Sequence, residues 1–242
     1  MLTSSIMKVT HDSQTALKAI QDAKSVGLLV AANAGVDPTG ALMALFHLFS
    51  VGGRKVVPIV PGRIPDAVRG LPSSIKIKRN FGPKNLVVTL DTNRTPIEKV
   101  SYKAEEQQFR LTIHPRERNF EVENIHYAYE GLDCDLLVTL GVRRLADLGE
   151  LYERNRADFE KTVIINLDVN PGNESFGQVN IVDPSKSSVS ELIFHQLLAW
   201  GTVPSKEVAQ CLLTGLAAGG TVPVTPVLEP LAVPLATKTV SG

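Results

Sequence analysis

The sequence contains little cysteine, no long hydrophobic run and no excess of charge. Only two of its 242 residues are cysteines, Cys134 and Cys211, and neither belongs to a CxxC pair. Two such cysteines make no disulfide framework, so we expect a reduced, cytoplasmic location. The longest apolar run, 26–34, has the length of a strand, whereas a membrane-spanning helix needs about 18–20 apolar residues. The composition therefore predicts that the protein has no membrane partner.

Charge and missing motifs exclude further classes of protein. Lys+Arg and Asp+Glu each number 25, which gives no net charge. A protein that holds nucleic acid mainly by charge is usually basic, so strong non-specific binding to nucleic acid is not expected. The sequence also lacks a Walker A sequence, a GxGxxG segment and a GxSxG segment. P-loop nucleotide binding, Rossmann-type dinucleotide binding and α/β-hydrolase chemistry therefore have no motif to support them.

Short apolar runs alternate with helical patterns along most of the chain. This alternation predicts the α/β fold class, as a doubly wound, mostly parallel sheet of about five strands. Pro58 cannot donate to a strand ladder, so its strand is expected at an edge of the sheet. A capping box, Ser188-x-x-Glu191, predicts the start of a helix, and further helices are expected over 40–50 and 205–216. The expected strands are 26–32, 55–60, 86–90, 136–140 and 162–167.

One stretch departs from this pattern. Val100–Lys103 and Phe109–Ile113 alternate with period two around AEEQQ, which predicts an antiparallel hairpin. We therefore expect 97–131 to be a hairpin insertion within one α/β domain over 1–220. The residues from 221 to 242 carry four prolines, two charges and no periodicity. Such a composition is typical of an extended, disordered tail.

Polar residues follow several of the expected strands. Because the carboxyl ends of parallel strands lie at one edge of a sheet, we expect Asp37, Asp91 and Asp168 at the same edge, together with Gly141. Converging carboxylates suit a hard cation such as Mg²⁺ or Mn²⁺. In an alternative interpretation, these acids cap loops and helix N-termini by accepting backbone N–H bonds. The candidate site residues are Asn33, Asp37, Asp91, Asp168 and Asn170.

Three segments at these positions resemble the motifs of one family. INLDVNPGNESFGQVNIVDPSKSSVSELI, residues 165–193, has the shape of a stretch with Asp-His-His, a nearby Asn, Phe-Gly, Asn, Val-Asp-Pro and a Ser-Ser-x-x-Glu helix start. NAGVDPTGALMAL resembles an Asn-Pro-Asp-Gly-Asp-Ala-Leu-Gly segment, and VAQCLLTGL resembles the helix before a last acidic motif. Over roughly residues 15–220 the chain thus resembles the N-terminal catalytic domain of DHH phosphoesterases, the group of nanoRNases, RecJ-type exonucleases and related phosphatases.

The resemblance implies a reaction as well as a fold. The family binds two divalent cations through histidines and aspartates, and their bridging water attacks a phosphodiester. Asp168 keeps the opening acid of the Asp-His-His motif, whereas Asn170 replaces its second histidine. Of the six positions that correspond to metal ligands, only one keeps its ligand type, and we therefore expect no dinuclear centre. These positions are Ala31, Gly35, Asp37, Gly141, Val169 and Gly219.

Two functions from different classes follow as hypotheses. In the first, the chain is a degenerate domain of this family, catalytically silent, without a cofactor and kept as a binding or interaction module. In the second, it is a metal-dependent phosphoesterase that acts on short oligonucleotides or nucleotide phosphates and uses Asp37, Asp168 and Asp91 with one Mn²⁺ or Mg²⁺ ion. The lost ligands favour the first hypothesis. The candidate ligand is a phosphate-containing small molecule or a short nucleic acid, and a homo-oligomer remains open.

Overall fold

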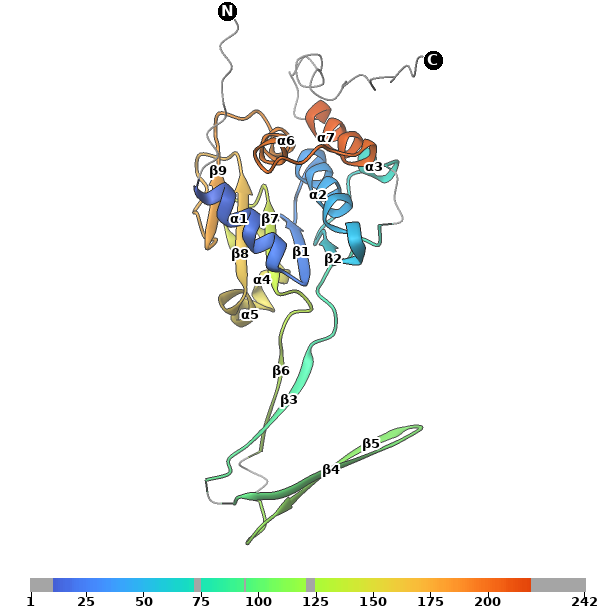
Figure 1. The fold of residues 1–242 in the computed structure, drawn as a ribbon, viewed down its shortest axis with the longest axis vertical. Helices are drawn as coiled ribbons and strands as arrows, with labels where there is room; N and C mark the ends of the chain where they lie inside the picture. The colour runs from blue at the N-terminus through green and yellow to red at the C-terminus, as the bar shows by residue number, and fades with distance from the viewer. Residues whose placement is uncertain (1–10, 72–74, 94, 121–124, 219–242) are drawn as a thin grey trace, which may run out of the picture. The chain divides into compact units, whose positions relative to one another are not determined.

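The computed structural model describes residues 11–71, 75–93, 95–120 and 125–218. These residues form two compact units, which are described separately (Figure 1). The α/β unit comprises Met1–Gly82 together with Leu132–Gly242, and the ribbon unit comprises Pro83–Gly131. The expected tail over 221–242 lies outside the described residues, and so does Gly219.

A five-stranded sheet forms the centre of the α/β unit, with strand order β2-β1-β7-β8-β9. Every neighbouring pair of strands in it is parallel, which confirms the α/β fold class and the expected number of strands. β2 is an edge strand, as Pro58 predicts, and the Pro58 carbonyl accepts a hydrogen bond from Lys78 N at 2.9 Å. The strands are β1 (Ser25–Val30), β2 (Lys55–Ile59), β7 (Leu136–Leu140), β8 (Val163–Asp168) and β9 (Val179–Val182).

Helices cover both faces of this sheet (Figure 1), so that the fold is doubly wound. Side chains alternate between the faces along a strand, and in β1 Leu28 joins one buried cluster whereas Leu29 joins the other. Helices α1 (His11–Asp22), α2 (Val36–Phe49), α3 (Asp66–Arg69), α6 (Val189–Ala199) and α7 (Lys206–Ala218) contribute to the first cluster. The second buried cluster includes side chains of η3 (Leu145–Leu148), α4 (Glu150–Glu153) and α5 (Arg156–Lys161). A short 3-10 helix, η1 (Val51–Gly53), follows α2.

The helix starts follow from local hydrogen bonding. Ser188 is the N-cap of α6, and its hydroxyl accepts a hydrogen bond from Glu191 N at 3.1 Å, as the capping box predicts. The Glu191 carboxylate accepts in return from Ser187 N at 2.8 Å. α2 begins at Val36, earlier than expected, because Pro38 is tolerated in the first turn of a helix. No helix in the described ranges is both long enough and apolar enough to cross a membrane.

The prediction that 86–90 is a strand of the main sheet is wrong. This segment belongs to β3 (Asn85–Leu90), which pairs antiparallel with β6 (Ile125–Glu130) in the ribbon unit. Leu86 and Val88 are exposed there, so the segment is apolar without being a buried strand. The fifth place in the main sheet belongs to β9, a four-residue strand that was not expected.

The predicted hairpin is confirmed. It is formed by β4 (Ile97–Glu105) and β5 (Gln108–Pro115), which pair antiparallel. Val100 lies opposite Ile113, and Tyr102 lies opposite Leu111, as the period-two alternation indicates.

The two units generate a first prediction. Both buried clusters draw their described residues from the α/β unit alone, and Gly82 N donates to the Asp133 carboxylate at 3.5 Å, so the chain leaves and re-enters this unit at nearby points. Replacing Pro83–Gly131 by a short Gly/Ser linker should therefore leave the α/β unit folded. We expect a cooperative thermal transition, followed by the fluorescence of Trp200, with a midpoint within about 4 °C of the full chain. Loss of the cooperative transition would contradict the independence of the α/β unit.

Candidate functional site

The strand order places a topological switch point beside β1. β2 lies on one side of β1 and β7 on the other, so the connections after β1 and β7 diverge at the carboxyl edge of the sheet. Open α/β sheets bind ligands at such a point. Asp37, Gly141 and Asp168 stand at the carboxyl ends of β1, β7 and β8 respectively, as expected. Asp91 does not follow a strand of this sheet, because β3 pairs with β6, and its carboxylate accepts from Asn93 N at 2.9 Å.

The Asp37 carboxylate joins two helices. It lies in the first turn of α2, and its oxygens accept hydrogen bonds from Val189 N at 2.8 Å and Ser190 N at 2.9 Å, in the first turn of α6. Ser190 Oγ donates to the Asp37 carbonyl at 3.3 Å. Burial raises the pKa of Asp37, and the hydrogen bonds from Ser190 and Val189 oppose this effect. Both carboxylate oxygens are therefore engaged in holding α6 against α2.

Two glycines allow this contact by close helix packing. A Cβ atom on Gly215 in α7 would collide with Ser190 Oγ and would lie 3.1 Å from the Asp37 carbonyl oxygen. A Cβ atom on Gly40 in α2 would lie 2.9 Å from the carbonyl oxygen of Cys211. The absence of both side chains lets α2, α6 and α7 approach one another around Asp37, in the arrangement visible in Figure 1.

The Asp168 carboxylate is engaged in the same way. It is only 3% exposed, and its Oδ1 accepts from Val169 N at 2.8 Å and Asn170 N at 3.3 Å. Its Oδ2 accepts from Asn173 Nδ2 at 2.7 Å. Asn173 also donates to the Val142 carbonyl at 3.0 Å, so it joins the connections that follow β7 and β8. This pattern matches the capping interpretation of the strand-end acids.

A buried asparagine network, which sequence reasoning did not identify, supports Asp168. Asn166 in β8 is fully buried, and its amide donates to Asn173 Oδ1 at 2.7 Å and to Asn180 Oδ1 at 3.3 Å. Thr139 Oγ1 of β7 donates to Asn166 Oδ1 at 3.2 Å. The available signal was the single polar residue within the otherwise apolar run Ile164–Leu167. Because these amides satisfy one another, the network orders the edge without leaving unpaired buried groups.

The remaining candidate positions are two exposed asparagines, one glycine with open space around it and one glycine with a positive φ. Asn33 and Asn170 are exposed, and Asn170 Oδ1 accepts from Gly172 N at 2.8 Å in a local turn. Gly35 has open space around its Cα, because a Cβ atom there would meet nothing within 4 Å. Gly141 has a φ of 61°, and a Cβ atom would lie 3.1 Å from Pro38 Cβ. Introducing an aspartate at Gly141 would therefore strain both the backbone and the packing.

The donor set at this edge does not fit a pair of divalent cations. Ala31, Gly35, Gly141 and Val169 provide no side-chain ligand for a metal ion. The two carboxylates at this edge already accept two and three hydrogen bonds respectively. Within the described residues, no group of three or more His, Cys, Asp and Glu side chains is placed to share a metal ion. A dinuclear centre needs several anionic ligands, which the described part of this edge lacks.

Two arginines follow β7 at the switch point. Arg143 and Arg144 are each about half exposed, and both approach Asp147, with Nε to carboxylate distances of 3.8 and 2.9 Å. The Arg143 carbonyl accepts from Glu174 N at 3.0 Å, which anchors its backbone to the connection after β8. The guanidinium groups are suited to phosphate oxygens, since they supply several N–H donors and a fixed positive charge.

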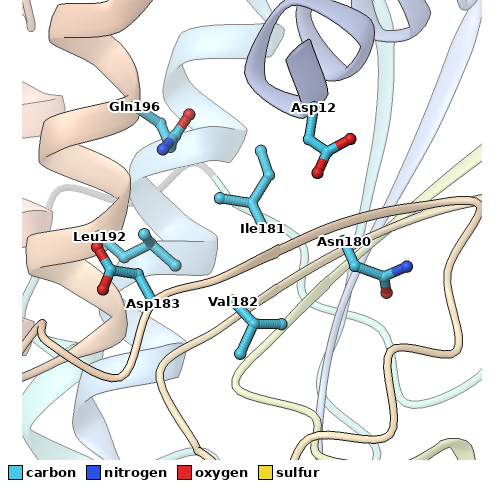
Figure 2. Close-up of a pocket in the computed structure, with 7 residues that line it drawn as sticks. All are labelled: Asp12, Asn180, Ile181, Val182, Asp183, Leu192 and Gln196. Atoms are coloured by element: carbon cyan, nitrogen blue, oxygen red, sulfur yellow. The ribbon is translucent and has the colours of Figure 1, made fainter. Parts of the chain in front are cut away.

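Two cavities lie away from these arginines. One, of about 240 Å³, lies against β9, α1 and α6; Figure 2 shows the Asp12 and Asp183 carboxylates on either side of Ile181 in this view. Two carboxylates disfavour a phosphate ligand by charge repulsion. The other, of about 440 Å³, is lined by five apolar side chains with Arg69 and Lys76. Neither cavity combines positive charge with convergent polar groups.

A second prediction separates structural from functional acids. Asp37→Ala would leave the N–H groups of Val189 and Ser190 without their acceptors, so we expect it to lower the free energy of unfolding by about 2–4 kcal/mol. Asp91→Ala is the matched control, because Asp91 is exposed and its bond in the described chain is a local one from Asn93 N. Its effect should stay below about 0.5 kcal/mol. Urea denaturation followed by Trp200 fluorescence measures both. Equal stability of Asp37→Ala and the wild type would contradict a structural role for Asp37.

Comparison with known proteins identifies the fold. No family model matches the sequence. The structure is similar to the crystal structure of an exopolyphosphatase-related protein from Bacteroides fragilis, with a TM-score of 0.60 and 19% sequence identity. The match covers 86% of this chain and 49% of that chain, so this chain spans about half the length of the protein it matches. At this level of identity the likeness shows a shared fold.

Proposed function

We propose that this chain is a catalytically silent domain of the DHH phosphoesterase type, which serves as a binding or interaction module. The observation that carries the proposal is that the carboxylates of Asp37 and Asp168 hold helices and loops in place. These are the two acids that the family motifs retain in the described part of the site, and the oxygens of both accept structural hydrogen bonds. Carboxylates that hold helices and loops in place are poor candidates for binding metal ions, because ligation would compete with the N–H groups they satisfy.

The likeness of fold supports the domain assignment. The exopolyphosphatase-related protein is matched over 49% of its own length, so the likeness concerns about half of that protein. In this chain, the motif-like segments after β1 and β8 lie at the carboxyl edge described above. The loss of metal donors at this edge, rather than a change of fold, distinguishes the chain from the active domains that it resembles.

The ligand class that we propose for this module contains phosphate. Arg143 and Arg144 lie at the switch point, where open α/β sheets bind ligands. The chain has no net charge, so a short ligand with few phosphates suits it better than a long nucleic acid. Nucleotides and oligonucleotides of a few residues therefore form the candidate ligand class.

A third prediction tests catalytic silence. Purified protein, incubated with Mn²⁺ or Mg²⁺ and with dinucleotides or nucleoside phosphates, should release no product above the background without protein. Calorimetric titration with Mn²⁺ should show no tight site. Turnover that a chelator abolishes and that Asp168→Asn removes would establish the rival metal-dependent phosphoesterase. A stability measurement on Asp168→Asn separates loss of turnover from loss of folding.

A fourth prediction tests the ligand class. If Arg143 and Arg144 contact phosphate, replacing both by alanine should weaken binding of a short oligonucleotide at least ~10-fold, because each charge-assisted hydrogen bond is worth more than about 1.4 kcal/mol. Arg154→Ala is the control for charge, since Arg154 is exposed and pairs with Glu150 at 2.7 Å, away from the switch point. Fluorescence anisotropy with a labelled oligonucleotide measures both. Equal weakening by the control would exclude a specific phosphate site.

A further inference from the structure

The ribbon unit has no hydrophobic core of its own among its described residues. It consists of two separate two-stranded sheets, β3–β6 and β4–β5. Thr95 is its only buried residue in the described ranges, and no hydrophobic side chain there is buried. An isolated two-stranded ribbon is marginally stable at best in water, and stability normally requires more strands or a packed face.

Each ribbon nevertheless has one apolar face. In β4–β5, Val100, Tyr102 and Ala104 lie opposite Ile113, Leu111 and Phe109, so these six side chains share a face. The other face carries Lys99, Ser101 and Lys103 opposite His114, Thr112 and Arg110. The rings of Tyr102 and Phe109 stack with centroids 5.8 Å apart. The pattern is that of a half-buried ribbon, yet the apolar face is open.

The second ribbon repeats this arrangement. Leu86, Val88 and Leu90 of β3 lie opposite Tyr129, Tyr127 and Ile125 of β6 on one face. Tyr127 and Tyr129 are 77% and 69% exposed, and Tyr102 and Phe109 of the first ribbon are 73% and 68% exposed. Eight of the large hydrophobic side chains that are exposed in the described chain belong to these two faces, namely Leu86, Val88, Val100, Tyr102, Phe109, Leu111, Tyr127 and Tyr129.

The exposed area is that of a protein interface. The four aromatic side chains, with about 200 Å² each when fully exposed, present on the order of 600 Å², and the four aliphatic side chains add to it. A stable interface buries about 800 Å² on each partner. Neither face alone reaches this area, whereas the two together do.

Charge identifies the kind of partner. Residues 83–131 contain 7 Lys and Arg and 8 Asp and Glu, so the ribbon unit is close to neutral. Exposed aromatic side chains bind single-stranded nucleic acid when they line a positively charged groove. The apolar faces lack such charge, since Lys99, Lys103 and Arg110 lie on the opposite face of β4–β5. A second copy of the chain brings the same neutral, apolar faces, so two copies attract through burial without net repulsion, and a two-fold axis makes one patch self-complementary.

We propose that the apolar faces of the β3–β6 and β4–β5 ribbons are the surface through which two copies of this chain associate. The association gives the ribbons a packed partner, which the described residues of the ribbon unit do not supply. This surface is inferred from residues of the ribbon unit alone, without use of the proposed ligand at the switch point.

The test uses substitutions on opposite faces of one ribbon. Sedimentation velocity should show the wild type as a dimer with a dissociation constant in about the micromolar range or tighter. Tyr102→Glu places a charge on the apolar face and should raise that constant at least ~10-fold. Thr112→Glu places the same charge on the polar face of the same ribbon and should leave the dimer intact. Tyr127→Glu and His126→Glu form the corresponding pair on the second ribbon.

Three results would overturn the proposal. They are a wild type that stays monomeric well above micromolar concentration, a Thr112→Glu variant that dissociates as much as Tyr102→Glu, and a dimer that persists when a linker replaces Pro83–Gly131. Trp200 fluorescence reports the fold of the α/β unit in every variant, because Trp200 Nε1 donates to the Ser13 carbonyl at 3.0 Å within that unit. The circular dichroism spectrum of Thr112→Glu should match that of the wild type if the ribbon tolerates a charge on its polar face without unfolding.

Discussion

The contact of the Asp37 carboxylate with the first turn of α6 is the constraint on which the carboxyl edge depends. It joins residues 152 and 153 positions apart in the sequence and brings the N-termini of two helices to the same acid. Each N-terminus carries partial positive charge, so a carboxylate between them is favourable despite its burial. Glycines at 40 and 215 remove the side chains that would keep α2, α6 and α7 apart. The positions of the connections after β1 and β7 follow from this packing.

The same constraint explains why a site that resembles a metal centre differs from one in chemistry. A carboxylate has about four lone pairs. Asp37 accepts two hydrogen bonds and Asp168 accepts three, all from backbone or amide N–H groups. The amides of Asn166 and Asn173 add neutral hydrogen bonds beside the Asp168 carboxylate. The positively charged groups at this edge include the two arginines after β7, both of which approach the Asp147 carboxylate. The guanidinium groups of these arginines are suited to phosphate oxygens.

The sequence predicts the parallel sheet well because a strand that is buried on both faces appears as a continuous apolar run. The runs at β1, β2, β7 and β8 are continuous and apolar, and Pro58 identifies an edge strand from its missing N–H group. The segment 86–90 is an apolar run of the same kind, but it pairs with β6 rather than with a strand of the main sheet. Pairing depends on residues distant in the sequence, so composition alone could not assign it. For the site, the motif-like segments located Asp37 and Asp168, whereas their hydrogen-bond partners, Ser190 and Asn173, depend on the folded arrangement.

The two units differ in where their hydrophobic side chains lie. The α/β unit buries the described core residues of the chain and carries the polar groups of the switch point. The ribbon unit carries most of the large hydrophobic side chains that are exposed in the described chain, although its strands have clear amphipathic alternation. Selection for folding within a single chain would leave no reason to keep six apolar residues on one face of an open ribbon, because such a face favours aggregation. The proposed association would explain why such a face is kept, because a second copy would cover it. Two ribbon units that are close to neutral would not repel each other strongly.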